Sequence, residues 1–208
     1  MKGATVGAIP YSTAKDWIVR LHYAKRVPSI SYAFGLFYEG KLSGVITYGS
    51  PASPFLAMGV CGVDWRSAVV ELNRLVILES GQNFASFLIG KSLQMLPRPS
   101  IVVSYADVGM GHVGYVYQAT NFIYTGATKP RTDIFSKSGH ARHHSGDRAI
   151  RQNRTAKHRY IFFVGDKRER RKMRLALNYP EMEYPKGDIR RYKVDATVIP
   201  YRQIRMKL

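Results

Sequence analysis

Apolar residues recur along this chain with two spacings, and each spacing predicts a different kind of element. Alternating or continuously apolar stretches predict strands, whereas apolar residues three and four positions apart predict helices. Glu39 and Gly40 form the expected turn of a hairpin. The predicted strands cover residues 5–9, 32–38, 41–49, 69–78, 100–107, 122–128 and 159–165. The predicted helices cover residues 12–21, 83–96, 113–120 and 166–177.

The first two helices each show one apolar face. Ser12 is the expected N-cap of the first helix and Asn83 that of the second. The inward-facing residues are expected to be Ala14, Trp17, Ile18 and Leu21 in the first, and Phe84, Phe87, Leu88 and Met95 in the second.

This order of elements predicts an α/β (α+β) fold with a mixed central sheet flanked by helices and parallel strands at its centre. A chain of 208 residues buries one sizeable core, so one main domain is expected. We expect residues 1–128 to form the catalytic core. Residues 129–208 are expected to form a basic part whose final strand and helix complete the same domain.

Two of the predicted central strands carry polar residues that a buried strand does not need. Glu71, Asn73 and Arg74 lie in the first of them, and strict alternation would place Arg74 on the opposite face from the other two. Ser104 and Tyr105 lie on opposite faces of the next strand. A buried charge or amide must be paired or useful, so these positions are candidates for a functional site.

Asp107 ends the second of these strands, at the sheet edge where α/β proteins bind ligands. Two interpretations remain open. Arg74 and Asp107 organise a functional cleft, or Arg74 forms a structural ion pair with Asp107 or Glu71. The number of polar residues in these strands favours the site.

Charge is distributed unevenly along the chain. Its net charge is +18, and residues 129–208 hold 22 of the 32 Lys and Arg residues but 8 of the 14 Asp and Glu residues, a net charge of +14. The stretch "GHARHHSGDRAIRQNRTAKHR" is typical of a loop that follows phosphates, so double-stranded DNA is the expected partner. The alternative is a solvated face or a disordered arm. The candidate DNA contacts are Arg142, His143, Arg148, Arg151, Arg154, Lys157 and Arg159.

Composition also excludes several classes of protein. Cys61 is the only cysteine, which rules out an internal disulfide and a cysteine-rich zinc site. No apolar run approaches the roughly 20 residues of a membrane span, and the N-terminus lacks the features of a secretory signal. We therefore expect a soluble intracellular protein with no membrane partner.

Three motifs, "ELNRL", "SYAD" and "GHVGYVYQATNFIYTG", follow one another in an order that resembles the Mom DNA-modification proteins of Mu-like phages. The resemblance runs through most of residues 8–126 and includes "WIVRLHY". It implies a GNAT-like acyltransferase fold and conversion of adenine in DNA to N6-carbamoylmethyladenine. Such a protein would be encoded by a phage or prophage, act in the cytoplasm of the bacterial host, and protect phage DNA from restriction.

The resemblance also implies which residues carry the chemistry. Asp107 would act as a base or metal ligand, and Arg74 would be the positive group of the site. The tyrosines that would stack on the flipped base, unless they are ordinary core residues, are Tyr105, Tyr117 and Tyr124. A divalent metal such as iron would be held by His22, Asp107 and His112. The candidate catalytic residues are His22, Tyr23, Arg74, Ser104, Tyr105, Asp107 and Tyr124.

The donor of the transferred group is expected to be acetyl-CoA or another acyl or aminoacyl compound. GNAT enzymes hold the pyrophosphate of coenzyme A with backbone amides of a glycine-rich turn, but here that turn, "LESGQNFAS", contains only Gly81. The product also attaches a methylene carbon, which simple acetyl transfer does not provide. The candidate cofactor contacts are Leu75, Ile77, Gln82, Asn83, Tyr117 and Asn121.

Two other functions remain open at this point. A GNAT N-acyltransferase acting on tRNA, a peptide or a small amine would share the fold. A non-catalytic DNA-binding protein would explain the basic part but not the polar strands.

Overall fold

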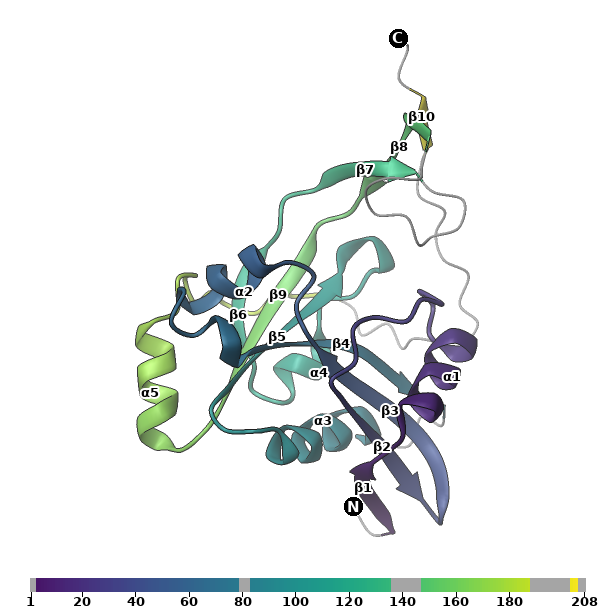
Figure 1. Ribbon diagram of the computed structural model, residues 1–208, viewed down its shortest axis with the longest axis vertical. Helices are drawn as coiled ribbons and strands as arrows, with labels where there is room; N and C mark the ends of the chain where they lie inside the picture. The colour runs from purple at the N-terminus through teal and green to yellow at the C-terminus, as the bar shows by residue number, and fades with distance from the viewer. Residues whose placement is uncertain (1–2, 79–82, 136–146, 188–202, 206–208) are drawn as a thin grey trace.

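A computed structural model of the protein describes residues 3–78, 83–135, 147–187 and 203–205 (Figure 1). Seven strands form the main sheet in the order β1-β2-β3-β4-β5-β9-β6. These strands are β1 (Ala4–Ala8), β2 (Tyr32–Tyr38), β3 (Lys41–Gly49), β4 (Val69–Ile77), β5 (Ser100–Asp107), β6 (Ile123–Ala127) and β9 (Lys157–Val164). The helices are α1 (Tyr11–Leu21), α2 (Pro54–Cys61), α3 (Phe84–Met95), α4 (Tyr115–Gln118) and α5 (Lys167–Leu175), with short 3-10 turns η1 (Arg66–Ala68) and η2 (Val108–Met110).

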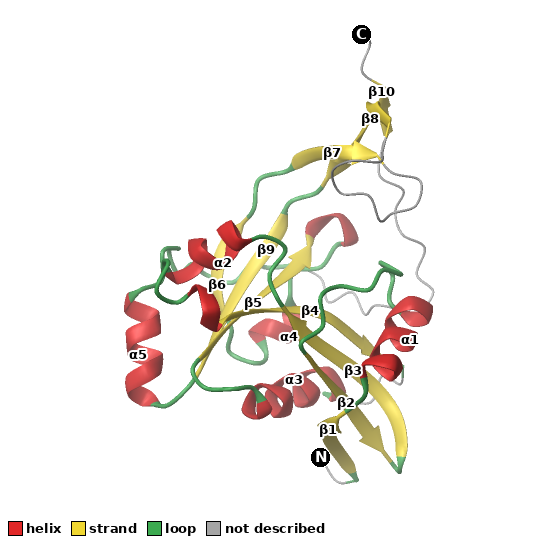
Figure 2. Ribbon diagram, viewed as in Figure 1, coloured by secondary structure: helices red, strands yellow, loops and turns green. Residues whose placement is uncertain are grey.

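Only β4 and β5, at the centre of the main sheet, run parallel. Every other neighbouring pair in this sheet is antiparallel. The mixed α/β fold with parallel central strands is therefore confirmed (Figure 2).

Helices cover both faces of the sheet, and each face has its own apolar core. On one face, α3 places Leu88 and Ile89 against Leu72 of β4 and Val102 of β5, together with Tyr117 of α4. The opposite face is covered by α1, α2 and α5. There Trp17 packs on Val45 and Val76, whereas Val60 and Met173 pack on Ile101, Val103 and Ile161.

The parallel pair β4–β5 separates before either strand ends. Pairing covers Val69–Leu72 against Ile101–Ser104, yet β4 continues to Ile77 and β5 to Asp107. On its other side, β4 has a bulge at Asn73, because Thr47 pairs with Arg74 and the next residue of β3, Tyr48, pairs with Leu72. A wedge therefore opens between the two central strands beyond Leu72 and Ser104, and we call it the β4–β5 wedge.

A second, three-stranded sheet extends from the main one. It contains β7 (Arg131–Phe135), β8 (Asp147–Arg154) and β10 (Gln203–Arg205) in the order β10-β8-β7. Because β7 follows β6 and β8 precedes β9, this sheet, here called the ribbon, prolongs the β6–β9 pair and projects from the body of the molecule (Figure 1). The expectation of a loop over residues 147–154 is wrong, since these residues form β8.

Several local expectations need correction. The Pro/Ser-rich connection after β3 contains α2, capped by Ser53, which accepts a hydrogen bond from the Leu56 amide. The first helix begins at Tyr11 with Pro10 as N-cap, not at Ser12. Asn83 precedes α3 as expected, but its side chain makes no capping hydrogen bond. Met95, expected to face inward, is 44% exposed because it lies in the last turn of α3.

Within the described ranges, no helix has the length and apolar character needed to cross a membrane.

Candidate functional site

Side chains from four elements meet at the open end of the β4–β5 wedge. His22 ends α1, Arg74 lies on β4, Asp107 ends β5, and Lys157 begins β9. The charge of Arg74 acts on both His22 and Lys157, and the charge of Asp107 acts on Lys157. Four segments that are distant in the sequence therefore share one electrostatic environment, which we call the wedge site.

Arg74 joins β4 to the loop that follows α1. Its guanidinium donates hydrogen bonds to the carbonyl of Asn73 at 2.6 Å and to that of Arg26 at 3.1 Å. The bulge at Asn73 shifts the alternation by one residue, so Arg74 lies on the same side of the sheet as Glu71. The expectation that Glu71 and Arg74 lie on opposite faces is therefore wrong.

His22 is buried and neutral. Its Nδ1 accepts a hydrogen bond from the Ala24 amide at 3.0 Å, so in the neutral ring Nε2 carries the hydrogen. Burial first, and then the charges of Arg74 and His112, lower its pKa to about 3. Tyr23 stacks on the His22 ring at 4.4 Å and meets the His112 ring edge-on at 6.3 Å. The wedge site thus contains a neutral imidazole that can donate from Nε2.

Asp107 is buried and engaged on both of its oxygens. Its Oδ1 accepts hydrogen bonds from the Thr155 hydroxyl at 2.5 Å and from the Gly109 amide at 3.0 Å. Its Oδ2 lies 3.6 Å from Nζ of Lys157. Burial lowers the pKa of Lys157 although Asp107 opposes that shift. Asp107 thus forms an ion pair with Lys157, which was not among the expected pairs of Arg74 with Asp107 or Glu71.

The three-ligand metal site expected at His22, Asp107 and His112 is not formed. Across the part of the chain that the structure describes, no three His, Cys, Asp or Glu side chains are grouped so that they could hold a metal ion. Nε2 of His22 carries its hydrogen and has no lone pair for a metal. Asp107 already has three partners. Burial lowers the pKa of His112 against the opposing effect of Asp107.

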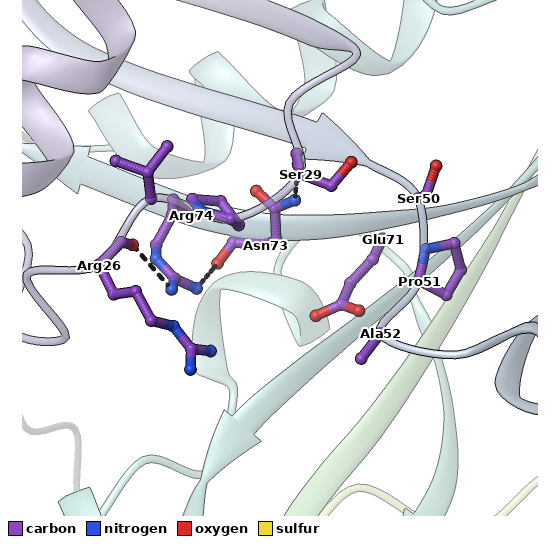
Figure 3. A pocket seen from close by; sticks show the side chains of 10 residues that line it. Arg26, Ser29, Ser50, Pro51, Ala52, Glu71, Asn73 and Arg74 are labelled. Atoms are coloured by element: carbon purple, nitrogen blue, oxygen red, sulfur yellow. Dashed lines mark hydrogen bonds between the residues drawn. The ribbon is translucent and has the colours of Figure 1, made fainter. Parts of the chain in front are cut away.

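A cavity of about 380 Å³ adjoins the wedge site (Figure 3). Glu71 and Arg74 contribute its floor from β4, and the loops after α1 and β3 form its walls. From the sequence, Glu71 was expected only as a possible ion-pair partner of Arg74, because the bulge that brings both residues to one side of the sheet has no signature in the sequence. The residues that line the cavity are Arg26, Val27, Pro28, Ser29, Ser50, Pro51, Ala52, Glu71, Asn73 and Arg74.

Two other predicted catalytic residues, Ser104 and Tyr124, lie on the α3 side of the sheet, whereas Tyr105 lies near Glu71, beside the wedge site. Ser104 faces the α3 side, where it donates to the Leu72 carbonyl at 2.9 Å and bonds the hydroxyl of buried Tyr117. The hydroxyl of Tyr124 bonds Nδ1 of His158 at 2.8 Å. Tyr105 faces the other side, as expected from alternation, and packs on the core beneath α2 and α5. Burial raises the pKa of each of these three tyrosines, so they are protonated groups in the core.

The predicted cofactor contacts are also dispersed. Leu75 and Ile77 lie on β4 beyond the point where β5 separates, and pack against the α3 side of the sheet. Asn121 is exposed in a left-handed turn (φ 60°) between α4 and β6. Gln82 lies outside the described residues. Leu75 and Ile77 thus border the wedge, Asn83 precedes α3, and the hydroxyl of Tyr117 bonds Ser104 where the two strands separate.

The predicted DNA contacts fall into four groups. Arg142 and His143 lie outside the described residues, and Arg148, Arg151 and Arg154 belong to the ribbon, where Arg154 pairs with Arg131 of β7. Lys157 belongs to the wedge site. Arg159 holds β6, because it donates to the Thr125 hydroxyl and carbonyl, both at 2.9 Å, and its guanidinium lies 3.3 Å from the Tyr179 ring centre. Arg159 therefore has internal partners, and its contact with DNA stays a prediction.

The fold is similar to those of solved acetyltransferases. A putative acetyltransferase from Salmonella typhimurium with its cofactor acetyl-CoA is 10% identical, with 80% of this chain and 96% of that chain covered and a TM-score of 0.49. A GNAT-family acetyltransferase from Bacillus cereus is 14% identical, with 78% and 99% covered and a TM-score of 0.46.

The sequence is also similar to those of known proteins. The matching residues include α1, β4 and β5, which carry His22, Arg74 and Asp107. A methylcarbamoylase Mom from Escherichia phage Mu is 30% identical over 126 residues. The alignment covers 55% of this chain and 52% of that protein, so the match spans about half the length of this relative. The model of the Mom protein family matches residues 3–146, which is more than half of the chain. This chain therefore belongs to the Mom protein family.

Proposed function

We propose that this protein modifies adenine in double-stranded DNA at its N6 amino group, with N6-carbamoylmethyladenine as the product. The observation that carries the proposal is the wedge site in a member of the Mom family. It combines the neutral imidazole of His22, the guanidinium of Arg74 and the Asp107–Lys157 pair between two separated strands. A protein that only bound DNA would not need buried groups of this kind in its sheet.

The charge distribution supports DNA as the substrate. Residues 129–208 carry a net charge of +14, and the ribbon belongs to this part. Arg131 and Arg154 lie directly opposite each other in the ribbon. Like charges opposite each other destabilise a strand pair, and a phosphate between or beside them removes the repulsion.

The chemistry requires the base to leave the double helix, because N6 is buried in the Watson–Crick pair. The amino group is a weak nucleophile, so the site must stabilise negative charge that develops on the donor. Arg74 supplies a fixed positive charge. The ring of His22 is already neutral and can donate a hydrogen bond from Nε2. Asp107 holds Lys157 beside them.

The donor is an acyl or aminoacyl compound. Plain transfer from acetyl-CoA would give N6-acetyladenine, whereas an aminoacyl group with two carbons and one nitrogen holds the same atoms as the carbamoylmethyl group. Among the described residues, no strand pairs with the edge of β4 that faces β5 from Asn73 to Ile77, so the backbone there, including Leu75 and Ile77, fits an extended chain. The first turn of α3 receives no side-chain cap from Asn83, so its amides fit an anionic group.

Mass spectrometry of nucleosides from the DNA of expressing cells tests the proposal. We expect a deoxyadenosine heavier by one carbamoylmethyl group, absent from the same host without the gene. An acetylated adenine would replace the proposed product by that of plain acyl transfer. Unmodified DNA in cells that contain folded protein, together with acylated tRNA or peptide, would favour a different GNAT substrate and overturn the proposal.

A further inference from the structure

Phe55 is the most exposed large apolar side chain among the residues that the structure describes, with 81% of its surface open to solvent. It is the second residue of α2. Ala57, Val60 and Cys61 of the same helix pack on the main sheet, so the ring of Phe55 lies on the outer face of α2. Single exposed apolar residues are common on protein surfaces, and the position of Phe55 therefore decides whether it has a use.

The backbone that carries Phe55 is fixed. The Ser53 hydroxyl accepts a hydrogen bond from the Leu56 amide at 3.2 Å, and Pro54 occupies the first position of α2, where its restricted φ suits the helix. Leu56 packs against the same core as Tyr105. The ring thus extends into solvent from the capped first turn of a packed helix.

Phe55 lies between the two regions that the proposed function uses. Pro51 and Ala52, which come shortly before it in the chain, line the cavity that adjoins the wedge site. α2 packs on Val103 of β5 and Ile161 of β9, and β9 follows directly from the ribbon. Figure 1 shows α2 in the half of the molecule from which the ribbon projects. A duplex held by the ribbon over the wedge site would therefore meet Phe55.

We propose that Phe55 inserts into the stacked bases of the duplex and fills the space that the flipped adenine leaves. Proteins that distort DNA insert apolar side chains between base steps, and Phe is one of these. An aromatic ring stacks on any base, because every base has a π-face. Phe55 would thus offset part of the cost of unstacking the adenine. This assignment rests on the proposed function, since it assumes that the adenine leaves the helix.

Binding to two matched duplexes tests the assignment without requiring turnover. The fluorescent duplexes have the same sequence, but one carries an abasic site in place of a single adenine, so the space is already open and no base has to leave the stack. We expect the parent protein to bind the abasic duplex about tenfold more tightly, because the ring gains its stacking contacts there at little cost. Phe55→Ala should bring this ratio to about one. Its affinity for the fully paired duplex should stay within about twofold of the parent, because the ribbon is unchanged.

Three further variants make the result specific to the ring. Leu175→Ala removes an apolar side chain of similar exposure, 79%, at the end of α5, and it should keep the tenfold ratio. Phe55→Trp keeps an aromatic ring and should also keep the ratio. If Phe55→Ala does not fold, Phe55→Gln, which removes the ring but keeps a long side chain, takes its place. A parent ratio near one, or a tenfold ratio that survives removal of the ring in folded protein, overturns the assignment.

A second copy of this chain is the other partner that an exposed ring could contact. Sedimentation of the parent as a dimer and of Phe55→Ala as a monomer, with the same ratio for the two duplexes in both proteins, would overturn the assignment and make Phe55 a contact between copies.

Nucleoside mass spectrometry separates this result from the fate of the proposed function. Carbamoylmethyladenine in the DNA of cells with the parent protein, together with a parent ratio near one, would remove the role of Phe55 while the proposed function stands. A preference for the abasic duplex that depends on Phe55, in a protein that leaves DNA unmodified, would keep the inserted ring and remove the reaction.

Discussion

The wedge site and the ribbon use charged residues in opposite ways. In the wedge site, each charge has fixed partners: Arg74 holds two backbone carbonyls, and Asp107 holds a hydroxyl, an amide and an ammonium group. In the ribbon, Arg131 is exposed and lies opposite Arg154, another cation. We propose a division of labour, in which the buried groups hold one geometry for chemistry and the cations of the ribbon supply affinity for a polyanion.

The two regions meet at a short joint. Thr155 and Ala156 connect β8 of the ribbon to β9 of the main sheet. The Thr155 hydroxyl bonds Asp107, and the Ala156 carbonyl accepts from the Val108 amide at 3.1 Å. The base of the ribbon is therefore attached to the end of β5, and Asp107 belongs to both regions.

The largest effect is expected from Arg74→Gln. This change removes the positive charge beside His22 and the hydrogen bond to the Arg26 carbonyl in the α1–β2 loop, so we expect modified adenine to fall about 1,000-fold, in line with the loss of a fixed electrostatic group. Affinity for paired DNA should stay within about twofold, because the ribbon is unchanged. Nucleoside mass spectrometry and a binding titration measure the two quantities.

Two matched variants sharpen this result. Arg20→Gln removes an exposed arginine that pairs only with Asp16 on α1, and it should leave modification unchanged. Arg74→Lys keeps the charge without the forked geometry and should retain partial activity. Equal losses of DNA affinity and modification in Arg74→Gln would break the separation between the two regions.

Much of the main sheet could be predicted from the sequence, because its strands and helices show clear periods. The β2–β3 hairpin, β4, β5, α3 and α5 all lie where the apolar pattern places them. The ribbon could not be predicted, since β8 is the polar run "DRAIRQNR", which has no apolar face to reveal a strand. Its strand form depends on pairing with β7 and β10, and such long-range pairing leaves little trace in a local window.

The wedge site was predicted in part for a related reason. His22, Tyr23, Arg74, Asp107 and His112 were named from motifs, and the structure brings them together. Glu71 was expected on the opposite face from Arg74, and Lys157 was expected to contact DNA. A single bulge at Asn73 reverses the face on which Arg74 lies, and the antiparallel pairing of β9 with β5 brings Lys157 to Asp107. Neither event has a local signal in the sequence.

An intermediate effect is expected at the joint, from Asp107→Asn. The change leaves Lys157 without its anionic partner, which for a fully buried pair costs about 3–5 kcal/mol. Since Lys157 is partly exposed and solvent screens the charge, we expect about 2 kcal/mol less free energy of unfolding in urea. Asp64→Asn, at an exposed position, should change the free energy of unfolding by less than about 0.5 kcal/mol. An Asp107→Asn protein of parental stability that made no modified adenine would instead assign Asp107 to the chemical step.

The smallest effect is expected from the ribbon, through the paired substitution Arg131→Ala and Arg154→Ala. Two phosphate contacts would be lost, so DNA affinity should fall about tenfold at moderate salt, and the slope of log K against log salt should shrink by about 2. Stability should not fall much, because the change also removes a repulsion between cations across the strand pair.

A charge-matched pair on α5 shows whether position matters or only net charge. Arg168→Ala with Arg171→Ala removes the same charge from exposed positions on a helix far from the ribbon (Figure 1). If the ribbon is the DNA-binding element, this pair should leave the salt slope almost unchanged. At saturating DNA, the ribbon variant should still modify adenine at the parental rate, because the wedge site is intact. Equal slopes in the two double variants would mean that the whole basic surface binds DNA without a defined arm, and the distinction between a wedge site for chemistry and a ribbon for affinity would no longer hold.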